Sequence, residues 1–245
     1  MKPLILLFLL AAMGLGATAV QAAGPSVPLD TVKVDVTNQA SLQRGARLFV
    51  NYCMGCHSAE YMRYNRVGRD LGLTENQVIA SMIFATDEQG ELVNPGSLMT
   101  NAMAPAYGNE AFGKAPPDLT LVTRVRGEDW IYTFLRSFYR DPSRPLGVNN
   151  AVFENVGMPH PLWELQGWQE KRVGEHGTRL QVVEAGSMSG PEYDRAIRDL
   201  VTFLSYMGEP MQVDRQRIGL YVLLFLLVFL VLAYLLKKEY WKDVH

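Results

Sequence analysis

The chain has 245 residues, 48% of them hydrophobic, and it carries 23 basic and 25 acidic residues for a formal net charge of −2. It lacks the excess of lysine and arginine that marks nucleic-acid-binding proteins, so we expect no nucleic-acid partner. Two uncharged apolar runs lie near the two ends of the chain. We therefore expect one folded domain between two segments that meet a membrane.

The first apolar run has the layout of a secretory signal peptide. Lys2 precedes an apolar stretch over residues 4–10, and small residues follow as far as Ala22. A basic start, a short apolar stretch and a small-residue cleavage site define such signals, and this stretch is short for a membrane span. We expect residues 1–22 to be removed, which leaves 22 basic and 25 acidic residues and a net charge of −3.

Helices are predicted where apolar residues recur every three or four positions. Residues 23–38 precede the first of them as an extended arm. A capping box of Thr74 with Gln77 marks the start of one helix. The predicted helices cover residues 41–53, the segment from 75 to ahead of Gly90, residues 118–139 with a break near Gly127, and the segment from Pro191 to about Gly208.

The segments between these helices are long. Residues 92–117 and 141–161 are rich in proline, glycine and other small or polar residues and are predicted to be loops. Residues 162–173 and 178–184 are predicted to pair as a small β-hairpin. Loops of this length are uncommon unless they perform a function or wrap a bound group.

The second apolar run predicts a membrane-spanning helix. Residues 218–236 form a run of 19 without a charge. A helix of that length spans roughly 28 Å, close to the ~30 Å hydrocarbon core of a bilayer. Because a signal peptide directs the export of the chain behind it, residues 23–213 are expected outside the membrane, 214–237 within it as an anchor, and 238–245 on the inner side.

Both cysteines of the chain lie in the pentapeptide Cys53-Met-Gly-Cys56-His57. C-x-x-C-H is the attachment signature of c-type haem. One helical turn separates two thiols that each add to a haem vinyl group, and the histidine is then carried beneath the iron as an axial ligand. A redox C-x-x-C pair would need a βαβ context, and a zinc site would need further ligands at matching spacing. We predict one covalently bound haem c.

The sixth ligand of the iron decides what such a haem can do. A closed His/Met site passes electrons and has a raised reduction potential, whereas an open position binds small molecules. Met103 and Met158 lie in loops with proline after them. Met158 is favoured because its loop precedes the last helix of the domain, where a wrapping chain would close over the haem. His160 is the alternative ligand.

A series of short motifs, taken in order, resembles the cytochrome c1 family. The resemblance covers roughly residues 38–245. The motifs are Ser41-x-x-Arg44-Gly45, Cys53 to Ser58, Pro116-Pro117-Asp118-Leu119, Arg124-Val-Arg126, Gly157-Met158-Pro159, Thr202-Phe203-Leu204 with Glu209-Pro210, and a single C-terminal span followed by lysines and Trp241. The mitochondrial pattern reads Gly-Met-Ala-Pro-Pro, whereas here Pro159 and His160 follow the methionine directly.

The resemblance implies an all-α, cytochrome c-like haem domain with long wrapping loops and one C-terminal transmembrane helix. It implies Met158 as the axial partner of His57. It also implies that Arg126, with Arg124 nearby, bonds a haem propionate, since a guanidinium pairs with a carboxylate in bidentate fashion. Pro116 and Pro117 would border the histidine side, where a backbone carbonyl can accept the ring N–H of His57.

The resemblance further implies a function. The chain would be a redox subunit, not an enzyme by itself, of ubiquinol:cytochrome c oxidoreductase. It would accept an electron from a Rieske iron–sulfur protein, beside a cytochrome b subunit, and pass the electron to a soluble periplasmic cytochrome c. The expected location is the bacterial inner membrane, with a single span and the haem domain on the periplasmic side.

Overall fold

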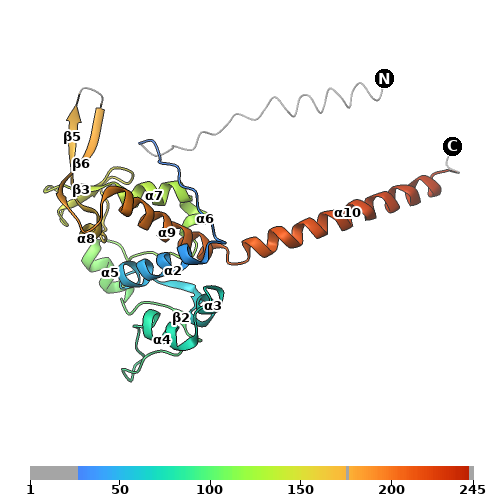
Figure 1. Cartoon of the computed structure of the whole chain (residues 1–245), viewed down its shortest axis with the longest axis horizontal. Helices are drawn as coiled ribbons and strands as arrows, with labels where there is room; N and C mark the ends of the chain where they lie inside the picture. Colours follow the sequence, from blue (N-terminus) through green and yellow to red (C-terminus); the bar gives the residue numbers. More distant parts are fainter. Residues whose placement is uncertain (1–26, 175–176, 243–245) are drawn as a thin grey trace.

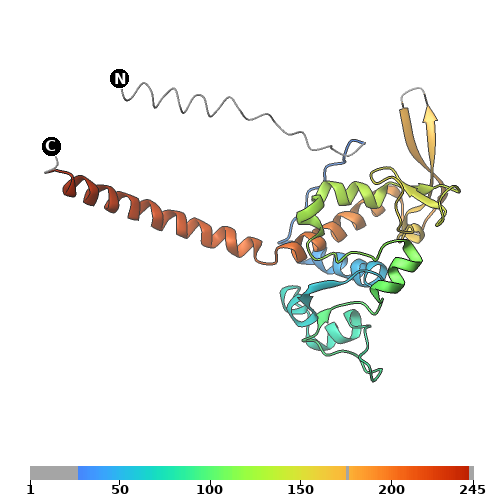
Figure 2. The same ribbon diagram turned by 180° about the vertical axis from the view of Figure 1, so that it is seen from behind.

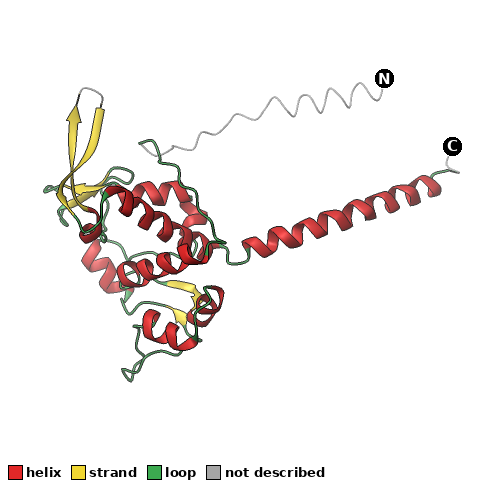
Figure 3. Cartoon of the chain, in the orientation of Figure 1, coloured by secondary structure: helices red, strands yellow, loops and turns green. Residues whose placement is uncertain are grey.

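The computed structural model describes residues 27–174 and 177–242 (Figure 1). The predicted signal peptide, residues 1–22, lies outside the described residues. A domain of helices and short strands is followed by one long helix, α10 (Gln212–Tyr240), which extends away from it. Helices dominate the domain, and its strands form small antiparallel pairs (Figure 3). The predicted fold class is confirmed.

The centre of the domain is the packing of α2 (Gln39–Leu48) against α9 (Gly190–Gly208). Asn38 caps α2 by accepting the N–H of Ser41, and α9 begins with a capping box. The two helices approach closely at Gly45, because a Cβ atom there would lie 2.1 Å from the carbonyl oxygen of Asp199. The rings of Phe49 and Phe203 meet beside this point, with centroids 5.7 Å apart.

The first helix of the domain runs on into the cysteine motif. α2 continues as a π-helical turn, η1 (Phe49–Cys53). The prediction of a helix over residues 41–53 is therefore confirmed, with a wider final turn. Such turns are frequent at functional sites, and this one delivers Cys53 at its last position.

Other predicted features are also present. The capping box of Thr74 begins α4 (Glu75–Met82). Gly127, with φ of 87°, separates α6 (Val122–Arg126) from α7 (Glu128–Arg136). The predicted hairpin is β5 (Gly167–Gly174) paired with β6 (Gly177–Ala185), and it projects from the domain (Figure 2). The short helix α8 (Trp163–Gln166) occupies the first part of the predicted first strand.

The two predicted loops contain more regular structure than we expected. The loop prediction for 92–117 is wrong over β2 (Leu98–Met99) and α5 (Pro105–Phe112). Proline at the first position of a helix loses no helical hydrogen bond, so Pro105 begins a helix instead of preventing one. The prediction for 141–161 misses β4 (Val148–Asn150).

Three further short elements were not predicted. β1 (Ala59–Arg63) pairs with β2, and β3 (Phe138–Arg140) pairs with β4. The helical prediction to residue 139 is therefore wrong at its end, since α7 stops at Arg136. The helix α3 (Tyr64–Asp70) follows β1. Elements this short carry too few apolar positions to reveal a period.

α10 is the one helix of the described residues that is long and apolar enough to cross a membrane. It has 29 residues, and none of them is buried against the domain. Its first turn lies beside α3 and α6 (Figures 1 and 2). The apolar surface of α10 therefore remains available for contact with lipid or with other membrane helices.

Candidate functional site

The cysteine motif forms one tight turn after η1. The backbone N–H groups of Cys56 and His57 both donate to the carbonyl of Cys53, at 3.1 and 2.9 Å. The two cysteines are not joined by a disulfide, and each is partly exposed. Burial raises the pKa of the Cys53 thiol to about 12. Both sulfur atoms are therefore free for the two thioether bonds of a c-type haem.

The ring of His57 is oriented by a distant backbone group. Its Nδ1 atom lies 2.7 Å from the carbonyl oxygen of Pro117. Because a carbonyl only accepts hydrogen bonds, Nδ1 carries the proton and Nε2 keeps its lone pair. Burial lowers the pKa of the imidazole, with the bond to Pro117 acting in the opposite direction. The histidine is thus held in the tautomer that ligates a metal through Nε2.

Two other segments of the chain form hydrogen bonds to this turn. The side chain of Asn101 donates to the carbonyl of Cys56, and its backbone N–H donates to Oγ of Ser58 at 3.0 Å. From the other segment, the N–H of Leu119 donates to the carbonyl of Ser58 at 2.9 Å. Sequence reasoning missed Asn101, because its bonds to Cys56 and Ser58 join positions 45 and 43 residues apart in the chain.

Met158 lies at the edge of a second, smaller hydrophobic cluster. Its side chain is partly buried against a group formed by Phe138, Val148 and Val156. The residue before it fits tightly, since a Cβ atom at Gly157 would lie 2.8 Å from the carbonyl oxygen of Phe112. The end of α5 therefore sets the position of the loop that carries Met158.

His160 is enclosed by aromatic rings. It is 4% exposed and lies parallel to the ring of Phe138, with centroids 4.9 Å apart. Trp168 meets it edge-on at 5.9 Å. Burial lowers the pKa of the His160 ring to about 4. Within the described part of the chain, neither ring nitrogen has a hydrogen-bond partner, so His160 packs here as a neutral aromatic group.

The two arginines of α6 contact different partners. The guanidinium of Arg126 lies over the rings of Trp130 and Phe153, at 5.0 and 5.9 Å from their centroids. Stacking of this kind leaves the N–H edge of the guanidinium free to bond a carboxylate. Arg124 instead pairs with Glu209, at 2.7 Å between Nη1 and Oε2.

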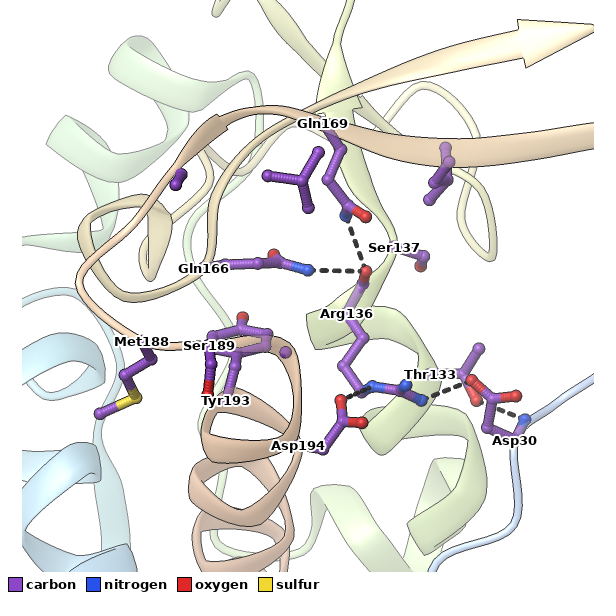
Figure 4. Close-up of a pocket in the computed structure, with 14 residues that line it drawn as sticks. Asp30, Thr133, Arg136, Ser137, Gln166, Gln169, Met188, Ser189, Tyr193 and Asp194 are labelled. Atoms are coloured by element: carbon purple, nitrogen blue, oxygen red, sulfur yellow. Dashed lines mark hydrogen bonds and ion pairs between the residues drawn. The ribbon is translucent and has the colours of Figure 1, made fainter.

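A cavity of about 530 Å³ lies apart from the cysteine motif (Figure 4). At its centre, Arg136 pairs with Asp194 at 2.7 Å and with Asp30 of the N-terminal arm at 2.5 Å. The side-chain amides of Gln166 and Gln169 donate to the backbone carbonyl of Arg136, at 3.0 and 2.9 Å. These contacts tie the base of the hairpin to α7 and α9, and none of the predicted haem residues lines the cavity.

The residues present fit a c-type haem. Two unbridged thiols and a histidine with a free Nε2 share one turn, and a thioether and an exposed guanidinium are provided by other segments. Together with a long unburied apolar helix, they define a membrane-anchored protein of the c-type cytochrome class.

Comparison with known proteins identifies the family. Residues 32–244 match the Cytochrome C1 family, so the chain belongs to that family, and membership implies a haem c. Cytochrome c1 of Allochromatium vinosum is 51% identical over 239 residues, which cover 94% of this chain and 96% of that protein. A protein of Nitrosomonas europaea named ammonia monooxygenase gamma subunit is 45% identical, over 97% of this chain and 98% of that protein. Cytochrome c1 of Rhodospirillum rubrum is 27% identical, over 84% of this chain and 83% of that protein.

Proposed function

We propose that this chain is the haem-bearing electron-transfer subunit of a ubiquinol:cytochrome c oxidoreductase. The observation that carries the proposal is the bond from His57 Nδ1 to the Pro117 carbonyl, on a C-x-x-C-H turn in a chain of this family. A histidine held in this way is prepared to ligate iron. The haem, when bound, supplies the one-electron chemistry, and the chain itself performs no bond-making reaction.

The proposed haem site uses residues from four segments. Cys53 and Cys56 would hold the group covalently, and His57 and Met158 would ligate its iron. Pro116 and Pro117 border the histidine side. Arg126 of α6 would bond a propionate, with Arg124 on the same helix. Trp130 and Phe153 support this arrangement because they hold the Arg126 guanidinium from its faces.

The proposed partners are those of the family. The subunit takes an electron from a Rieske iron–sulfur protein and passes it to a soluble periplasmic cytochrome c. It stands beside a cytochrome b subunit in the bacterial inner membrane. Residues 1–22 are the signal peptide, 23–213 the periplasmic haem domain, 214–237 the anchor and 238–245 the cytoplasmic tail. The single candidate span among the described residues supports this layout.

The test of the site is an optical spectrum of the purified, oxidised full-length protein. A weak band at the red edge reports sulfur bound to ferric iron. We expect the band in the native protein, its loss in Met158→His, and a lowered reduction potential in Met158→Leu. His160→Phe is the matched control, because phenylalanine keeps the aromatic stacking. Absence of the band from the native protein, or a band that survives in Met158→His, would reject the proposed ligand.

The covalent link has its own test. Cys53→Ala and Cys56→Ala should each impair haem staining on a denaturing gel. Normal staining in both variants would contradict attachment through these thiols.

A rival function is that of a haem subunit in another membrane enzyme. The relative from Nitrosomonas europaea is named as a subunit of a different enzyme, ammonia monooxygenase. Purification from native membranes distinguishes the two. We expect a b-type haem and an iron–sulfur protein to co-purify with the chain. Co-purification with another membrane enzyme, in the absence of these two, would favour the rival. Rapid carbon monoxide binding by the reduced protein would instead indicate an open iron.

A further inference from the structure

The junction between the domain and α10 contains two carboxylates that each contact two arginines. Glu209 binds Arg124 and Arg215. Asp70 binds Arg66 at 2.5 Å and lies 3.7 Å from Arg69. One carboxylate balances only one of its two guanidiniums, so each group of three keeps a positive charge.

These two groups lie beside the same helical turn. Arg66 reaches the start of α10, with its Nη2 atom 3.4 Å from the sulfur of Met211. Arg215 belongs to α10 itself, and its contact with Glu209 brings Arg124 of α6 to that turn. We call these four residues the junction arginines: Arg66, Arg69, Arg124 and Arg215.

At this junction the arginine side chains are more exposed to solvent than the carboxylates that they contact. The side chains of Asp70 and Glu209 are 21% and 19% exposed, whereas those of Arg69 and Arg215 are 73% and 60% exposed. Arg124 is exposed as well, and Asp214 is the exposed carboxylate of the turn. The outer surface of the junction therefore presents three guanidiniums, those of Arg69, Arg124 and Arg215, against one carboxylate.

The height of this surface relative to a bilayer is set by α10. The uncharged run begins at Ile218, immediately after Arg217. At about 1.5 Å per residue, Arg215 and Arg217 lie only ~2–5 Å beyond the first apolar residue. The polar layer of a bilayer is roughly 5–8 Å deep on each side. The junction arginines therefore lie at the level of the lipid phosphates.

We propose that the junction arginines form a binding site for the phosphate headgroup of an anionic lipid. Guanidinium groups suit this ligand because they bond phosphate oxygens in bidentate fashion and are weakly hydrated. The proposal rests on α10 crossing a bilayer and not on electron transfer, so either can fail without the other. The lipid would fix the orientation of the haem domain over the membrane.

The test measures binding of short-chain phosphatidylglycerol to the full haem-loaded chain in non-ionic detergent, with phosphatidylcholine of equal chain length as reference. All proteins carry Lys237→Gln, Lys238→Gln and Lys242→Gln, so that the other end of α10 contributes little. We expect tighter binding of phosphatidylglycerol, and a loss of about fivefold per arginine in Arg69→Gln with Arg215→Gln. Both side chains are exposed, so helix content and the haem spectrum should not change.

The matched control removes two exposed arginines from the hairpin, Arg172→Gln with Arg179→Gln, which changes the net charge equally. Unchanged affinity in this control supports a local site, and an equal loss would overturn it. Displacement of the lipid by equimolar inorganic phosphate would show a site for free anions instead.

A protein could occupy the same surface, and the intact assembly tests this. After lipid extraction, Arg69 and Arg215 should react with an arginine-specific reagent. Continued protection would show that a neighbouring subunit covers them, and the lipid proposal would then be wrong.

Discussion

At the scale of single residues, glycine decides where the proposed sulfur ligand lies. Gly157 contacts the carbonyl at the end of α5 so closely that no side chain fits between them. The loop consequently presents Met158 at one position. His57 is oriented in a comparable way by the carbonyl of Pro117. Both proposed ligands are thus positioned by backbone groups, which are more rigid than side chains.

Gly157→Ala tests this arrangement. The added Cβ atom would lie 2.8 Å from the carbonyl oxygen of Phe112, so the loop must move. We expect the red-edge band to weaken or disappear and the reduction potential to fall, while haem staining persists because Cys53 and Cys56 are untouched. Gly190→Ala is the control, since its Cβ atom would meet nothing within 4 Å. An unchanged spectrum and potential in Gly157→Ala would contradict the argument.

At the scale of elements, the α2–α9 contact holds the cysteine turn against the core. Asp199, 4% exposed, accepts hydrogen bonds from Ser41 at 2.6 Å and from Nε of Arg44 at 2.6 Å. These polar bonds fix the two helices in register, and Gly45 allows them to approach. Since η1 follows α2 without a break, the position of Cys53 depends on this packing.

Gly45→Ala should destabilise the domain. Its Cβ atom would overlap two groups of α9, at 2.1 Å from the Asp199 carbonyl oxygen and 2.7 Å from the Cβ of Phe203. Overpacking of this kind costs about 1–3 kcal/mol. Denaturant unfolding of the haem-loaded protein measures the loss, with Gly190→Ala again as the control. A midpoint equal to that of the native protein would show that the helices separate at little cost.

The link between α6, α9 and α10 should depend on pH. Hydrogen bonding by Arg215, with added attraction from Arg124, lowers the pKa of Glu209 from its ordinary value of 4.5. The folded state therefore favours the anion. This stabilisation is complete above pH 4.5 and is lost as the pH falls further, through the lowered pKa of the folded state.

Spin labels at the exposed positions Leu121 and Gln216 test this prediction. We expect the distribution of distances between them to broaden as the pH falls below 4.5. In Glu209→Gln the distribution should be broad at every pH. A distribution that is narrow and constant in both proteins would contradict the role of Glu209.

At the scale of the whole molecule, the haem domain and the anchor are separate bodies joined at one turn. No residue of α10 is buried, and the core clusters of the described residues contain no residue beyond Met207. The domain therefore does not depend on the anchor for its core.

Deletion of residues 212–245 should release a soluble domain that keeps its haem. We expect it to remain in the supernatant without detergent, with the spectrum of the full-length protein and a nearly unchanged Tm. Sedimentation and absorbance spectroscopy measure this outcome. Aggregation of the truncated protein, or loss of its red-edge band, would show that α10 contributes to the fold.

The long elements could be predicted because their signals are local. The helices α2, α4, α9 and α10 each combine a repeated apolar pattern or an uncharged run with a start signal or a charged boundary. The short strands β1 to β4 and the helix α5 could not be predicted in the same way. Their pairing partners lie far away in sequence, and the proline that begins α5 has the same local appearance as a proline in a loop.

The sequence by itself determined the haem-attachment motif and the candidate span. Both depend on neighbouring residues, since five consecutive positions carry the attachment chemistry and an uncharged run of sufficient length makes a span. Only the tertiary structure decided which backbone carbonyl, that of Pro117, 60 positions from His57, accepts its ring N–H. It alone brought Arg124 and Arg215 onto Glu209. These contacts join segments distant in the chain, so they exist only when the core has packed those segments together.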